Sequence, residues 1–181
     1  MKKPNLNLKR ASLLTSSLLC SALLIAVPLR KELNEDWKFK QARLNNWYPA
    51  TVPGVVHTDL MDNKIIEDPF FRLNERSMQW IDKEDWIYQT TFRLTPEMME
   101  KQNIELVFKG LDTYADVYLN DKKILEANNM FREWRTNIKP NLESGENILK
   151  IYFHSPIKVD IPKWDALPYH CLLYTSDAAD E

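Results

Sequence analysis

The stretch "GLDTYADVYLND", residues 110–121, indicates the fold class most directly. Its second half is typical of a strand, and the run "KKILEA" (122–127) that follows is typical of another. Asn120 and Asp121 lie between the two runs, and both residue types tolerate the positive φ angles that a two-residue hairpin turn requires. The stretch therefore predicts two antiparallel strands joined by a tight turn at Asn120-Asp121.

Four further segments have the two-residue apolar/polar period of a half-buried strand. They are residues 34–42, 85–94, 103–110 and 143–155. Turn signals separate them, and no internal repeat or low-complexity tract interrupts the series. Short alternating strands with little helix predict an all-β fold, an antiparallel β-sandwich formed by one domain over about residues 33–169.

One or two short helices are expected beside the strands. The first covers residues 57–63, where apolar side chains recur on one helical face. The second covers residues 96–101, because Thr95, Pro96 and Glu97 supply an N-cap, a proline at the first helical position and an acidic first turn.

Composition excludes several function classes. The chain carries 24 Lys and Arg against 26 Asp and Glu, a formal net charge of -2, so it has no excess of positive charge to attract a nucleic acid. Its three Gly lie far apart and form no phosphate-binding loop. Cys20, Cys171 and the three His do not fall at metal-ligand spacing, so we expect no metal and no cofactor.

Both ends of the chain are expected to lie outside the fold. Basic residues before position 11 and a mostly apolar run over 11–27 are typical of a secretory signal, and the run is short for a spanning helix. We therefore interpret residues 1–32 as a signal peptide or disordered N-terminus of a secreted or periplasmic protein with no stable membrane partner. An uncleaved anchor and lipidation at Cys20 are the alternatives. Residues 170–181 have the character of a translated sequencing adapter, so we expect the natural protein to continue past position 169.

Several segments, in this order, resemble the N-terminal sugar-binding domain of family 2 glycoside hydrolases, and most of all its β-mannosidase branch. The features shared with the family are "LNEDWKF", "DWIYQTTF", "LVFKGLDTYADVYLND" and "LESGENILKIYF". The features typical of the branch are "ATVPGVVHTDL", "DPFFRLNERSMQW", "GLDTYADVYLN", "NNMF" and "YFHSPI". The resemblance covers roughly residues 33–155.

The resemblance implies a jelly-roll sandwich of the galactose-binding-domain type. It also implies an exo-acting hydrolase that removes terminal non-reducing β-D-mannose with retention. The family's two catalytic glutamates lie on a TIM barrel further along the chain, so we expect no catalytic residue in this segment and no activity from it alone. β-Mannoside oligosaccharides are expected to bind through the full-length enzyme, in which this domain packs on the barrel and on further sandwich domains.

Asp112 and Asp116 are the nearest sequence match to a catalytic pair. A retaining glycosidase needs two carboxyl groups about 5–5.5 Å apart. The two residues would meet only if the three residues between them turned tightly, but the strand alternation resumes at Asp116. We therefore predict a structural corner, held by hydrogen bonds from nearby amides to Asp side chains, as in the family that it resembles.

The best candidate for contact with a substrate is the segment "DPFFRLNERSMQW", predicted to be a long ordered loop. In related family members a loop of this domain extends to the active site. Arg72, Asn74 and Glu75 supply donors and acceptors for sugar hydroxyls, and Trp80 supplies a flat apolar face for a pyranose. The alternative is that Trp80 packs the loop with its two Phe residues, and that Arg72 and Glu75 form a weak surface ion pair.

Two other functions remain open at this point. A free-standing secreted carbohydrate-binding module would display an aromatic platform on one sheet face and end naturally after "YFHSP". A fragment of a β-galactosidase or β-glucuronidase of the same family would share the fold, but "GLDTYADVYLN" and "DPFFRLNE" favour the β-mannosidase branch.

Overall fold

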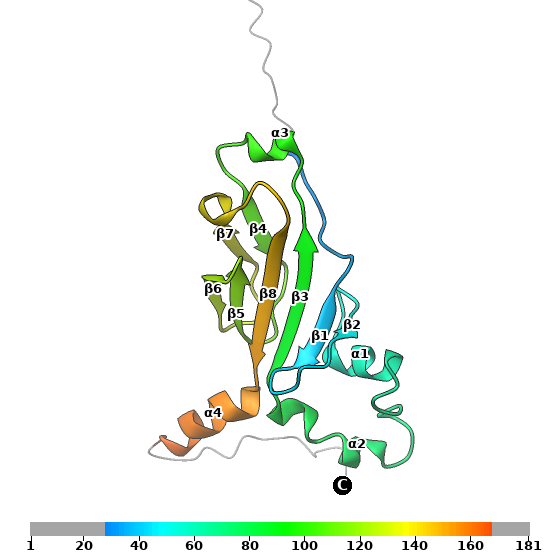
Figure 1. Ribbon diagram of the computed structural model, residues 1–181. Helices are drawn as coiled ribbons and strands as arrows, with labels where there is room; N and C mark the ends of the chain where they lie inside the picture. The colour runs from blue at the N-terminus through cyan, green and yellow to red at the C-terminus, as the bar shows by residue number, and fades with distance from the viewer. Residues whose placement is uncertain (1–27, 168–181) are drawn as a thin grey trace, which may run out of the picture. The chain divides into compact units, whose positions relative to one another are not determined.

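The computed structural model describes residues 28–167 (Figure 1). The predicted signal segment, up to residue 27, and the predicted adapter segment, 170–181, lie outside the described residues. The chain divides into the units Met1–Arg30 and Lys31–Glu181, and the fold reported below is that of the second unit.

A six-stranded antiparallel sheet forms one layer, in the order β2-β1-β3-β8-β5-β6. Pro49, in β2, lies on the edge strand, where its missing N–H breaks no ladder bond. The bounds are β1 Lys38–Gln41, β2 Tyr48–Pro49, β3 Trp86–Phe92, β5 Tyr114–Leu119, β6 Lys122–Ala127 and β8 Asn147–His154.

The second layer is a two-stranded antiparallel sheet of β4 (Glu105–Phe108) and β7 (Trp134–Asn137), which lies behind the six-stranded sheet in Figure 1. Its inward side chains Leu106, Phe108 and Trp134 pack against the core. The six-stranded sheet contributes Phe39, Val117, Leu119 and Leu149 among others to that core. The predicted antiparallel β-sandwich is confirmed.

The predicted hairpin is confirmed as well. β5 pairs with β6, and Asn120 and Asp121 between them adopt φ of 49° and 62°. Both residues thus take the left-handed conformation that a two-residue turn requires and that Asn and Asp tolerate better than most side chains.

The structure contains more helix than the one or two short segments expected. α1 (Val56–Asp62) and α3 (Pro96–Met99) lie where the sequence places them, and Thr95 Oγ1 accepts a hydrogen bond from the Met98 amide as the predicted N-cap. α2 (Asn74–Ser77) and the 3₁₀ turn η1 (Ile81–Lys83) form within and after the segment predicted as a loop. A further 3₁₀ turn, η2, covers Lys139–Asn141.

α4 (Pro156–Asp165) is the longest helix of the described chain and was not predicted. Its N-terminus has a readable signal, because Ser155 Oγ accepts a hydrogen bond from the Lys158 amide and Pro156 takes the first position. The rest of the segment lacks the periodic apolar pattern by which a helix is normally predicted. Pro162 lies inside the helix, and none of the helix's side chains is buried.

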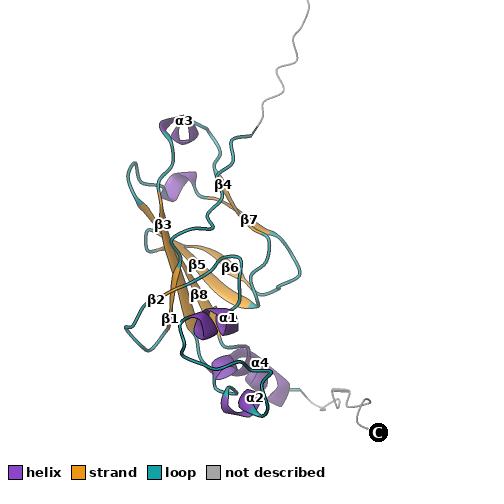
Figure 2. Ribbon diagram, turned by 90° about the vertical axis from the view of Figure 1, so that its right-hand side faces the viewer, coloured by secondary structure: helices purple, strands orange, loops and turns teal. Residues whose placement is uncertain are grey.

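One row of paired residues marks one end of the six-stranded sheet, hereafter the Trp86 end. The register aligns these residues across the strands: Gln41, Trp86, Phe153, Ala115 and Ala127. The chain segments that leave the sheet from this row are the β1–β2 loop, the α2–η1 segment, α4, the corner before β5 and the β6–β7 loop. Figures 1 and 2 both place α2 and α4 at this end and α3 at the opposite end.

Candidate functional site

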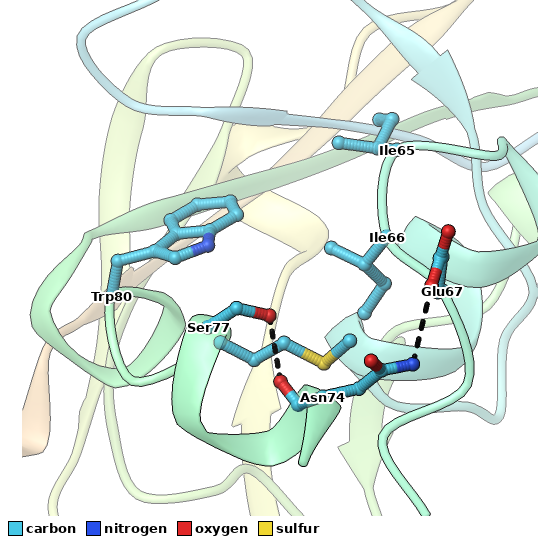
Figure 3. Close-up of a pocket in the computed structure, with 7 residues that line it drawn as sticks. Ile65, Ile66, Glu67, Asn74, Ser77 and Trp80 are labelled. Atoms are coloured by element: carbon cyan, nitrogen blue, oxygen red, sulfur yellow. Dashed lines mark hydrogen bonds between the residues drawn. The ribbon is translucent and has the colours of Figure 1, made fainter. Parts of the chain in front are cut away.

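A cavity of about 250 Å³ opens beside α2, at the Trp86 end (Figure 3). It brings together two of the four residues predicted to contact a substrate, Asn74 and Trp80, whereas Arg72 and Glu75 do not line it. The lining residues are Ile65, Ile66, Glu67, Asn74, Ser77, Met78 and Trp80. The lining thus combines four apolar side chains with three polar ones, which could hydrogen-bond to a ligand.

Asn74 holds the polar side of the cavity in place. Its Nδ2 donates to Glu67 Oε2 at 3.3 Å and to the Asp68 carbonyl at 3.0 Å, and its own carbonyl accepts from Ser77 Oγ at 2.7 Å (Figure 3). No described residue donates to Asn74 Oδ1, so this oxygen can accept a hydrogen bond from a ligand hydroxyl.

Trp80 forms the aromatic wall. Its ring centroid lies 6.0 Å from that of Trp86, with the planes tilted by 43°. Trp86 is itself buried, and its Nε1 donates to the Ile81 carbonyl at 3.1 Å. The half-buried Trp80 ring is therefore supported from the core and has limited freedom, as a stacking surface for a sugar ring requires.

Arg72 and Glu75 lie on the outer surface of the same segment. Arg72 adopts φ of 57°, and its guanidinium carbon lies 5.0 Å from the centroid of the Phe71 ring. The structure has no ion pair between Arg72 and Glu75, which was the alternative considered for them. Substrate contact by any of the four residues stays a prediction.

A buried polar group beside α1 was missed by the sequence analysis. Asp59 is 1 % exposed; its Oδ1 accepts from the Thr51 amide at 2.8 Å and its Oδ2 accepts from the Tyr88 hydroxyl at 2.7 Å. Burial, and then the bond to the Asp59 carboxylate, raises the pKa of Tyr88 above its ordinary range. The only sequence signal was an Asp among the apolar residues of the motif "ATVPGVVHTDL".

Asp112 and Asp116 contact different partners. Asp112 lies in the corner before β5, where its Oδ1 accepts a hydrogen bond from Thr113 Oγ1. Asp116 lies within β5 and pairs with Lys123 Nζ at 2.7 Å and with His154 Nε2 at 3.1 Å. Partial burial raises the pKa of Asp116, but the hydrogen bonds from Lys123 and His154 outweigh burial and leave it below its usual value.

These contacts give the two carboxylates no common site for an acid and a nucleophile. Their structural role stays a prediction. Within residues 28–167 no group of three or more His, Cys, Asp or Glu side chains is placed to hold a metal ion. None of the helices in that range has both the length and the apolar character needed to cross a bilayer.

Comparison with known proteins identifies the fold family. The family model described as the glycosyl hydrolase 2 galactose-binding domain-like domain matches residues 37–179. The chain belongs to this family. It is 37% identical to the β-mannosidase of Capra hircus over 125 residues, which are 69% of this chain and 14% of that protein.

Solved structures of other glycosidases share the galactose-binding domain-like fold. The β-D-mannosidase of Dictyoglomus thermophilum superposes with a TM-score of 0.74 and 44% identity, over 76% of this chain and 17% of that one. The β-D-glucuronidase from the same organism reaches a TM-score of 0.53 at 21% identity, over 78% of this chain and 22% of that one, which shows the fold alone. The goat β-mannosidase is much longer than this chain, which spans about a seventh of its length.

Proposed function

We propose that this chain is the N-terminal domain of a β-mannosidase that removes terminal non-reducing β-D-mannose with retention of configuration. The observation that carries the proposal is the 44% identity and TM-score of 0.74 to the D. thermophilum β-D-mannosidase, against 21% and 0.53 for the β-D-glucuronidase. The identity to the goat β-mannosidase supports the same substrate class.

The domain itself is proposed to be a scaffold that also forms part of the rim of the sugar site. The cavity beside α2 supplies the rim, with Asn74 accepting from a sugar hydroxyl and Trp80 stacking on a pyranose face. The paired carboxyl groups that retention requires are proposed to lie in the barrel that follows, so the 181-residue chain has no hydrolytic activity. Export to the periplasm or the medium is part of the same proposal and is supported by the signal-like first 32 residues.

The test is to recover the complete reading frame and to assay its product on aryl β-mannoside, β-galactoside and β-glucuronide. We expect cleavage of the mannoside by the full-length protein and none by the 181-residue chain. A frame that stops near position 170, or a full-length product that prefers the galactoside or the glucuronide, would contradict the proposal.

A further inference from the structure

The side-chain hydrogen-bond donors that line the cavity beside α2 are mostly engaged within the protein. Asn74 Nδ2 donates both of its hydrogens, one to Glu67 Oε2 and one to the Asp68 carbonyl. Ser77 Oγ donates its single hydrogen to the Asn74 carbonyl (Figure 3). Among the side chains of the lining, only the Trp80 indole N–H has no acceptor within residues 28–167. A ligand can therefore receive a hydrogen bond from one lining side chain at most.

Acceptors and negative charge, by contrast, are available in the same cavity. No described residue donates to Asn74 Oδ1 or to Glu67 Oε1, and the Ser77 hydroxyl oxygen keeps its lone pairs. Glu67 is the only charged residue of the lining. No Lys or Arg among residues 28–167 forms an ion pair with it. The cavity is thus rich in acceptors, poor in donors and acidic.

This set of groups favours a ligand that supplies donors and a positive charge. An ammonium group has three donors and no acceptor, and its hydrogen bonds to a carboxylate are stronger than those between neutral groups. A sugar hydroxyl supplies one donor and no charge. A uronate carboxylate supplies acceptors alone and is repelled by Glu67. Among sugars, the cavity therefore favours one with a free amino group over a neutral or an acidic one.

The aromatic wall leaves room for such a sugar to lie between its two sides. Figure 3 shows Trp80 across the cavity from Glu67 and Asn74. A sugar ring that stacks on Trp80 can direct an amino group toward the Glu67–Asn74 side. The volume of about 250 Å³ is slightly below the range usual for drug-sized ligands, which suits a single sugar unit.

We propose that the cavity beside α2 binds a sugar that carries a protonated amino group, with Glu67 as its counter-ion and Asn74 Oδ1 as a hydrogen-bond acceptor. The inference rests on the proposed function, since it places this amino sugar next to the terminal mannose. The substrate class is then a β-mannoside whose adjoining sugar has a free amine in place of a hydroxyl, an N-acetyl group or a carboxylate.

The test compares D-glucosamine, D-glucose and N-acetyl-D-glucosamine as ligands of the full-length protein at about pH 6, where an aliphatic amine is protonated. Their dissociation constants are measured by NMR titration, which requires no hydrolysis. Glu67→Gln removes the charge and keeps an oxygen that can accept from Asn74 Nδ2. Glu75→Gln is the matched control, because it removes the same charge from α2 at a residue that does not line the cavity.

We expect the wild type and Glu75→Gln to bind glucosamine about tenfold more tightly than the other two sugars, as one charge-assisted hydrogen bond to a partly exposed carboxylate allows. Glu67→Gln should lose most of this preference. With disaccharides of the same linkage, kcat/KM of the wild type should favour mannosyl-glucosamine over mannosyl-glucose by a similar factor.

Four results would overturn the proposal. They are no binding of glucosamine, equal affinity for glucosamine and glucose, equal affinity for glucosamine and N-acetylglucosamine, and a preference that survives in Glu67→Gln. A binding preference without its counterpart in kcat/KM would overturn the position beside the mannose. A Glu67-dependent preference in a protein that cleaves no β-mannoside would support the amino-sugar site while the proposed function fails, and mannoside cleavage without the preference would do the reverse.

Discussion

The hydroxyl of Tyr88 donates to Asp59 Oδ2 at 2.7 Å, and this bond ties α1 to the central strand β3 across 29 positions of sequence. Both side chains are buried, and the other oxygen of Asp59 is already engaged by the Thr51 amide. The bond ties the 49–62 segment to the sheet, because breaking it leaves a buried carboxylate and a buried hydroxyl each with one hydrogen bond fewer.

Tyr88→Phe is therefore expected to destabilise the domain by about 1–3 kcal/mol, since it leaves a buried carboxylate with one partner fewer. The measurement is the free energy of unfolding in urea. Tyr48→Phe is the matched control, because Tyr48 packs on the same Phe39 ring but its hydroxyl has no hydrogen-bond partner within the described residues. Equal effects of the two substitutions would show that the Asp59–Tyr88 bond contributes little.

Asn147 is the second buried polar group whose loss we expect to be costly. It is fully buried; its Oδ1 accepts from the Glu143 amide and from Asn120 Nδ2, and its Nδ2 donates to the Glu143 and Gly145 carbonyls. Asn147→Ala should lower the free energy of unfolding by about 2–4 kcal/mol, because it leaves several of these groups unsatisfied. Asn103→Ala, on an exposed loop, serves as the control in the same urea titration. A change below the control's would mean that water replaces the amide.

Gly54 and Gly145 form a contrasting pair. A Cβ on Gly54 would lie 2.3 Å from the Thr51 carbonyl oxygen, whereas a Cβ on Gly145 meets nothing within 4 Å. Gly54→Ala should destabilise by about 1–3 kcal/mol, because a backbone atom must move to admit the methyl group. Gly145→Ala should change stability by about 0.5 kcal/mol or less. Thermal unfolding of both variants decides the matter, and a neutral Gly54→Ala would show that the segment before α1 yields easily.

The strands and the hairpin could be predicted from the sequence because their signals are local. An apolar/polar alternation and a turn type need only a few neighbouring residues. α4 could not, since it buries no side chain and its helical pattern is interrupted by Pro162. The partners of Asp59 could not either, because Tyr88 lies far away in the sequence and only the tertiary fold brings the two together.

Only part of the candidate site could be predicted, because local sequence indicates residue types but not where their side chains point. The composition of the segment indicated which residue types could contact a sugar. Which of them point into the cavity depends on backbone conformation, such as the φ of 57° at Arg72, which nothing local demands of an arginine. As a result Asn74 and Trp80 line the cavity, and Arg72 and Glu75 do not.

Stability should fall in acid because three aspartates, Asp85, Asp116 and Asp160, are ionised more easily in the folded state. The pKa of Asp116 is below its ordinary 3.8, because the bonds from Lys123 and His154 outweigh partial burial, and the pKa of Asp85 is lowered because bonds from the Ser155 amide and Lys158 outweigh its burial. A lowered folded pKa gives stability that is fully present above the unfolded pKa of 3.8 and is lost as the pH falls through the folded pKa. The free energy of unfolding should therefore decline as the pH drops below about 5.

Asp116→Asn should make that decline shallower, because it removes one of the aspartates whose pKa is lowered in the folded state. The measurement is a series of urea unfolding curves at several pH values. Asp62→Asn, on the exposed side of α1, controls for the loss of a negative charge. An unchanged acid slope in Asp116→Asn would show that the contacts with Lys123 and His154 do not hold the carboxylate in its charged form.

Substitutions of Asn74 and Trp80, which line the cavity beside α2, test its role in the full-length enzyme. Asn74→Ala removes a hydrogen-bonding group and should raise KM for aryl β-mannoside about two- to tenfold, the range that one lost hydrogen bond allows. Trp80→Ala should raise KM further, and Trp80→Phe should recover part of the loss because a flat ring remains. Gln79→Ala is the matched control, because Gln79 lies between Asn74 and Trp80 in the sequence but does not line the cavity. Wild-type KM in both alanine variants, with unfolding midpoints unchanged, would place the sugar elsewhere and leave this cavity as loop packing.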